Sequence, residues 1–182
     1  MYSLQTAMGT RKIEWTEQTW NPVTGCAKVS PGCKHCYAER MALRLQVMAA
    51  PGYARGFTLT LHADRLGQPL GRKKSTLYFV CSMADLFHED VPDAFIDRVL
   101  TTVHHTPWHT YQLLTKRAER LPDFFASRPV PPNVWLRVTV EDRRHGLRAS
   151  TCSARFPLAS VSCRSSRCWR TWDRSTCAAS TG

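Results

Sequence analysis

The chain alternates between short runs of consecutive apolar residues and longer segments whose apolar residues recur at helical spacing. Short continuous runs are typical of strands that are buried on both faces, and they lie at 77–81, 111–114 and 134–140. Helical spacing follows Pro92 and recurs over 117–125. The order strand, helix, strand, helix, strand predicts parallel βα units.

Two further elements are expected nearer the N-terminus. The segment before Cys26 would supply a first strand, and 38–48 is predicted to be a helix with Met41, Leu45 and Met48 on one face, as core side chains. Together the elements predict an α/β fold, either the beginning of a β/α barrel or an open sheet. We favour a partial, incomplete β/α barrel of parallel βα units.

Polar residues follow each predicted strand at its carboxyl end, where barrels of this type gather their chemistry. They are Ser82 and Asp85, Thr115 and Lys116, and Glu141 and Asp142. For any one of them alone, an ordinary strand-to-loop transition or a helix cap is the simpler interpretation. Several such ends beside one cluster of cysteines favour a functional site.

Three cysteines, Cys26, Cys33 and Cys36, lie on a loop rich in glycine and proline. Two residues separate Cys33 from Cys36, which allows both sulfurs to face one centre. Pro31 and Gly32 bend the chain so that Cys26 can reach the same centre. Three thiolates would leave a metal site one ligand short.

Three interpretations of this loop remain open. The first is zinc, since Cys3His is a common structural ligand set and His35 or a distant histidine could complete it. The second is an iron–sulfur cluster held by three cysteines, with one iron open for a substrate or cofactor. The third is cysteine without a ligand role, because free cysteine behaves as a small apolar residue.

Length and composition indicate an ordinary globular protein. With 182 residues, 43% of them hydrophobic, the chain can bury one core and is expected to form one domain. No charged segment followed by an apolar run begins the chain, and no stretch is long enough to span a bilayer. We therefore expect no membrane association and a reducing, cytoplasmic location without disulfides. Met8 is an alternative start.

The formal net charge of +11 raises the question of a nucleic-acid partner. Residues 143–182 carry eight arginines and one acid, which accounts for +7 of this charge, so the body of the chain supports such a partner only weakly. His104, His105 and His109 would suit a non-catalytic, zinc-stabilised nucleic-acid-binding protein. They lie at a predicted helix end and before a strand, where caps and solvated positions are usual.

Five separated strings, in matching order and spacing, resemble those of a phage and bacterial family of unknown function that has a three-cysteine motif. They lie at 20–26, 31–40, 82–92, 114–117 and 140–142. The resemblance covers roughly residues 11–147. That family in turn resembles radical S-adenosylmethionine enzymes, whose partial β/α barrels carry three cluster cysteines on the loop after the first strand.

The second resemblance implies a cofactor-dependent enzyme. Cys26, Cys33 and Cys36 would ligate a four-iron, four-sulfur cluster, and the open iron would bind S-adenosylmethionine. One electron would then cleave the sulfonium and release a deoxyadenosyl radical, so an electron donor and an unknown substrate are the implied partners. Six residues separate Cys26 from Cys33, whereas that class usually has three, and zinc remains the alternative cofactor.

Within the same resemblance, strand-end position assigns four further roles. Ser82 and Asp85 would contact the methionine or ribose end of S-adenosylmethionine, which makes them the predicted cofactor-binding residues. Lys116 and Glu141 would meet the substrate or a carboxylate, which makes them the predicted catalytic residues.

From Arg148 onward the apolar periodicity ends, and serine, arginine and cysteine become frequent. The cysteines there fit no common zinc spacing, and a basic arm that binds phosphate is an alternative. When the segment is written as codons with favourable choices and translated in the neighbouring frame, the result shows alternating strand and helix patterns. It resembles the continuation of the same family. We hypothesise the loss of one base near Leu147. This divides the chain into a barrel domain, 1–147, and an out-of-frame, disordered tail, 148–182, and implies an impaired enzyme with an unpaired sheet edge.

Overall fold

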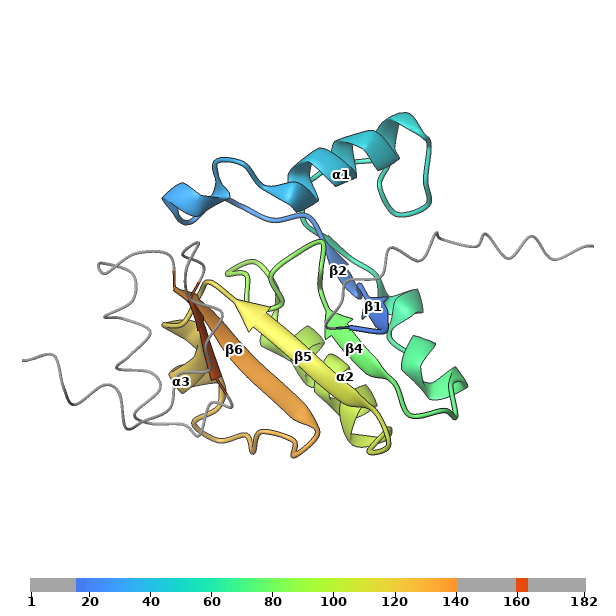
Figure 1. Cartoon of the computed structure of the whole chain (residues 1–182), viewed down its shortest axis with the longest axis vertical. Helices are drawn as coiled ribbons and strands as arrows, with labels where there is room; N and C mark the ends of the chain where they lie inside the picture. Colours follow the sequence, from blue (N-terminus) through green and yellow to red (C-terminus); the bar gives the residue numbers. More distant parts are fainter. Residues whose placement is uncertain (1–15, 141–159, 164–182) are drawn as a thin grey trace, which may run out of the picture.

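Five strands form one parallel sheet in the computed structural model, which describes residues 16–140 and 160–163. Their order across the sheet is β1 (Gln18–Trp20), β4 (Leu77–Val80), β5 (Thr110–Thr115), β6 (Val134–Val140) and β7 (Ser160–Cys163). Each neighbouring pair is parallel, so all the carboxyl ends meet at one edge of the sheet. The fold is α/β, an incomplete β/α barrel of parallel βα units, as the sequence predicts (Figure 1).

Helices α2 (Asp93–His104) and α3 (Arg120–Phe124) cover one face of this sheet (Figure 1). The apolar stripe of α2 packs there against alternate strand residues, which include Tyr78, Val80, Tyr111, Leu113, Leu136 and Val138. Tyr78 stacks on Tyr111 with 5.5 Å between ring centroids. Pro92 keeps an extended backbone and is the N-cap of α2 rather than its first helical residue.

A smaller layer lies over the carboxyl ends of the strands. In it β2 (Val23–Thr24) pairs antiparallel with β3 (Thr60–Leu61), and α1 (Tyr37–Val47) follows the cysteine loop (Figure 1). The expectation that Met48 is a core residue is wrong, because its side chain is 65% exposed. Met41 and Leu45 are half-buried against a small cluster around Tyr53.

The polar connection between β3 and β4 contains two short 3-10 helices that apolar spacing did not predict. They are η2 (Ala63–Arg65) and η3 (Gln68–Gly71). Trp20 Nε1 donates to the carbonyl of Arg65 at 2.8 Å, and Trp108 Nε1 donates to the carbonyl of Arg72 at 3.0 Å. These bonds fasten the connection to β1 and to the residues before β5.

After Val140 the structure describes only 160–163, which form β7 beside β6. Among the described residues the sheet is therefore open, with β1 and β7 as its outer strands, and it ends at β7 rather than at β6. Met8, Glu141, the proposed boundary at Leu147 and the rest of the predicted tail lie outside the described residues. Within the described ranges, every helix is too short or too polar to cross a membrane.

Candidate metal centre

The cysteine loop begins at a backbone position that favours glycine. Gly25 has a φ of +81°, and a Cβ there would lie 2.3 Å from the carbonyl oxygen of Thr58. The amide of Gly25 donates to the carbonyl of Met83 at 3.0 Å, and Gly25 forms a parallel bridge with Ala84. The loop therefore begins beside the residues that follow β4, and Cys26 is the next residue after Gly25.

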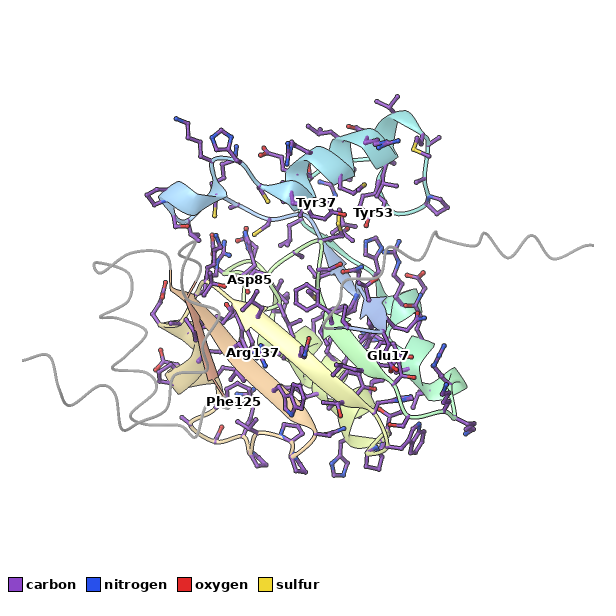
Figure 2. All side chains as sticks on the ribbon, in the orientation of Figure 1. Glu17, Tyr37, Tyr53, Asp85, Phe125 and Arg137 are labelled. Carbon is purple, nitrogen blue, oxygen red and sulfur yellow. The ribbon has the colours of Figure 1, made fainter. Side chains whose placement is uncertain are left out.

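This loop carries its cysteines over the carboxyl ends of the strands. Cys33 ends a single 3-10 turn, η1 (Pro31–Cys33), and Cys36 directly precedes α1. Both, like Cys26, are free thiols of intermediate exposure. Figure 2 shows sulfur atoms along the loop, with Asp85 between the loop and the sheet. A further free thiol, Cys81, is buried in the core, which raises its pKa to about 12.

Two cations reach the loop sulfurs from the end of β5. Lys116 Nζ lies 3.7 Å from Cys33 Sγ, and Arg117 Nη1 lies 3.6 Å from Cys26 Sγ. Burial raises the pKa of Cys26, against the hydrogen bond and charge of Arg117. Burial also opposes ionisation of Cys33, but hydrogen bonds from Ser30 and the backbone, with the charge of Lys116, outweigh it and lower the pKa of Cys33.

Arg117 joins the loop to the strand ends, a role that sequence reasoning missed. It is only 4% exposed, its Nε donates to Glu89 Oε2 at 2.6 Å, and its Nη2 donates to the carbonyl of Ala27 at 3.4 Å. Burial would lower the pKa of Arg117, but the bond to Glu89 and the charge of Asp85 raise it, so the group is a permanent buried cation. The sequence feature that could have indicated this role is the position of Arg117 directly after Lys116, within the string 114–117 that resembles the family.

The predicted cofactor-binding residues lie at strand ends, where they bond to the protein itself. Asp85 is 6% exposed, and its carboxylate accepts hydrogen bonds from Thr115 Oγ1 at 2.8 Å and from the amide of Lys116 at 3.0 Å. Ser82 Oγ donates to Asn21 Oδ1 at 3.1 Å. Asp85 thus ties β4 to β5, and Ser82 ties β4 to β1. Contact of either residue with a cofactor stays a prediction.

The three histidines considered for a zinc-stabilised protein lie at the opposite end of the strands from the cysteine loop. His104 and His105 end α2, and His109 directly precedes β5, so all three are at the amino ends of the strands. His88, which the sequence did not single out, is closer. It is 2% exposed, and its Nε2 accepts from the amide of Ala27 at 3.2 Å, with burial lowering its pKa.

The donor chemistry of the loop fits an iron–sulfur cluster. Thiols are the ligands that such clusters use, and hydrogen bonds to sulfur and nearby charge tune them. Lys116 and Arg117 supply both. A closed zinc site needs a fourth ligand, and His35 is exposed on the loop. Across residues 16–140 and 160–163, no three His, Cys, Asp or Glu side chains form a group that could hold a metal ion, so the three loop cysteines do not converge on one centre in this structure.

The sequence matches a family model described as "Protein of unknown function (DUF5131)" over residues 10–162. The chain belongs to this family. The match includes the three loop cysteines and both cations, and it continues beyond Leu147. None of the curated proteins matches the chain at a significant level.

Solved structures of spore photoproduct lyase are similar to this fold. A cysteine-to-serine mutant shares 12% identity at a TM-score of 0.57, over 84% of this chain and 45% of that chain. A double mutant described with bound AdoMet and dinucleoside spore photoproduct shares 13% identity at a TM-score of 0.49, over 74% of this chain and 39% of that chain. The chain thus spans less than half the length of these structures, and the likeness shows the fold alone.

Proposed function

We propose that this protein is a radical S-adenosylmethionine-type metalloenzyme in which Cys26, Cys33 and Cys36 hold a four-iron, four-sulfur cluster. One observation carries the proposal. Three free thiols lie on the loop after the first strand of an incomplete β/α barrel, and a buried arginine and a lysine approach two of them. The fold that the chain shares with spore photoproduct lyase supports the same class.

When bound, the cluster and S-adenosylmethionine would supply reductive cleavage of the sulfonium and a deoxyadenosyl radical. The chain's own residues bind and orient. Arg117 holds Cys26 and the carbonyl of Ala27 beside the strand ends, and Asp85 fixes the backbone of Lys116. Ser82 and Asp85 are proposed to lie beneath the cofactor.

Lys116 is proposed to hold a carboxylate or the substrate beside Cys33, and Glu141 to meet the substrate. The implied partners are an electron donor and a substrate that these residues do not identify. Because the chain spans less than half of the lyase structures, the activity and partners of a whole enzyme belong to this proposal, as does the impairment that the predicted tail implies.

The test is formation of deoxyadenosine. The chain is reconstituted anaerobically with iron and sulfide, reduced chemically with S-adenosylmethionine present, and the products are separated by chromatography. Deoxyadenosine is expected from the wild type and from the matched control Cys81→Ala, which alters a buried thiol away from the loop. The triple variant Cys26→Ala, Cys33→Ala and Cys36→Ala should form none. A reconstituted cluster that never yields deoxyadenosine would contradict the proposal.

A further inference from the structure

The sheet face that turns away from α2 and α3 carries several polar side chains where it crosses β5 and β6, with the half-buried Leu114 as the register partner of Arg137. Side chains alternate along a strand, so Gln112 of β5 and three residues of β6 share this face, while their sequence neighbours fill the core. The β6 residues are Trp135, Arg137 and Thr139. Figure 2 shows Arg137 on the face turned to the viewer, whereas α2 passes behind the sheet in Figure 1. We call these four residues the inner face.

Three of the four carry a buried polar atom that finds no hydrogen-bond partner among the described residues. The atoms are Gln112 Oε1, Arg137 Nε and Thr139 Oγ1. Gln112 is only 5% exposed. Leaving such an atom unpaired is unfavourable, and a water, ion or ligand that completes it is one explanation for its presence in a native protein. Barrel interiors are otherwise filled by bulky apolar residues.

The guanidinium of Arg137 and the ring of Trp135 indicate which kind of ligand would pair with the inner face. No carboxylate of residues 16–140 forms an ion pair with Arg137, whose guanidinium carbon lies 5.9 Å from the ring centroid of Trp135. A planar guanidinium matches the oxygens of phosphate or carboxylate. Thr139 adds a hydroxyl two residues along the same strand. Trp135 is 40% exposed and offers a flat surface on which a ring can stack.

An oxyanion alone does not satisfy this set. Gln112 Oε1 is an acceptor, so the ligand must also present an N–H or O–H donor. Gln112 and Trp135 are register partners on adjacent strands, which brings the acceptor and the ring side by side. Phosphate, ring and ring-bound N–H occur together in nucleotides, and stacking of a base on an aromatic side chain contributes to binding.

We propose that the inner face binds a ligand of the nucleotide class, with its phosphate on Arg137 and Thr139, its base against Trp135 and a base N–H donated to Gln112. This proposal gives the proposed function a substrate class, the nucleotides. It rests on the proposed function only where it treats the bound nucleotide as the substrate. Binding itself requires no cluster, because Gln112 and Trp135 precede the strand ends that face the cysteine loop.

Calorimetric titration of the full chain, purified anaerobically, tests this with three probes: the common nucleoside monophosphates, adenosine and inorganic phosphate. At least one monophosphate is expected to bind tenfold or more tightly than phosphate or adenosine. Arg137→Met should weaken that binding at least tenfold. Thr139→Val, a milder change that keeps the side-chain volume, should weaken it several-fold. The matched control Arg98→Met alters an exposed arginine of α2 and should leave it unchanged.

Three results would overturn the proposal. If inorganic phosphate binds as tightly as the monophosphate, the base makes no contact that contributes to binding. If Arg137→Met and Thr139→Val both bind the monophosphate as the wild type does, the ligand does not bind at the inner face. One-for-one displacement of the nucleotide by S-adenosylmethionine would assign the face to the cofactor. Nucleotide binding by a chain that takes up no cluster would contradict the proposed function and leave the inner-face site standing.

Discussion

Arg117 Nη1 lies 3.6 Å from Cys26 Sγ, although 91 positions separate the two residues in the sequence. The same guanidinium donates to Glu89 and approaches Asp85 Oδ2 at 3.4 Å. One buried cation therefore joins the first cysteine of the loop to residues that follow β4. Because the side chain of Asp85 is 9% exposed, removal of this cation would leave its carboxylate buried without its cation.

Arg117→Met is expected to lower the free energy of unfolding by about 3 kcal/mol, because loss of the guanidinium leaves the carboxylate of Asp85 buried without an opposite charge. Equilibrium urea denaturation measures the loss. The matched control Arg128→Met removes an ion pair with Asp97 whose side chains are 31% and 43% exposed, and it should cost less than about 1 kcal/mol. Equal losses for the two variants would mean that the Arg117 contacts contribute no more than a surface pair.

The loop thiols should differ in reactivity with pH. The thiolate is the nucleophile, the pKa of Cys33 is lowered and that of Cys26 is raised, so Cys33 should be alkylated several-fold faster near neutral pH. Both thiols ionise as pH rises, so the rate ratio should widen as pH falls from about 9 to about 7. Peptide mass spectrometry of the metal-free, reduced chain after iodoacetamide measures both rates.

Lys116→Met should slow alkylation of Cys33 and leave that of Cys26 nearly unchanged, because it removes the ammonium beside Cys33. Buried Cys81, with its pKa raised to about 12, serves as the unreactive internal control. Identical rates for Cys26 and Cys33 at neutral pH would refute the electrostatic difference between the two sites.

Gly25→Ala is expected to destabilise the chain by more than about 1 kcal/mol and to slow cluster incorporation. The positive φ and the carbonyl of Thr58, 2.3 Å from the new Cβ, would force the start of the loop to move. Gly71→Ala is the matched control, because a Cβ there meets nothing within 4 Å. Thermal unfolding and the absorbance of the reconstituted cluster are the measurements. A Gly25→Ala variant that behaves like Gly71→Ala would show that the loop tolerates another path.

The lost base near Leu147 stays a prediction that resequencing of the locus tests. One missing base upstream of the codons for the tail is expected. A codon path that encodes 148–182 in the family's own frame would refute it. The family match to residue 162 and the pairing of β7 with β6 both reach into this segment as it is translated here, and neither supports a lost base.

Strands β4, β5 and β6 were predictable because each contains a short apolar run that ends in polar residues. Strand β1 has no such run and was expected only as a strand before Cys26, and β7 was not predicted because it lies in the predicted tail. The two-residue strands β2 and β3 are too short to show any periodicity. Met48 was placed wrongly for a different reason. Helical spacing tells which residues share a face of α1, but the layer that covers a face is set by distant parts of the chain.

The same distinction applies to the site. The spacing of the cysteines and the polar strand ends predicted the loop and Asp85 as parts of one region, and the structure brings them together. The contact of Arg117 with Cys26 depends on how the loop lies over β5, which no local pattern encodes. Strand-end position likewise singled out Asp85 but not Thr115, whose hydroxyl binds it.

The most direct test of the account is the metal content of the anaerobically reconstituted chain. Iron and acid-labile sulfide are each expected at about four per chain, retained in Cys81→Ala and lost when Cys26, Cys33 and Cys36 are all replaced by alanine. One zinc per chain without sulfide, bound through the same three cysteines, would contradict the account and support a zinc-stabilised protein instead.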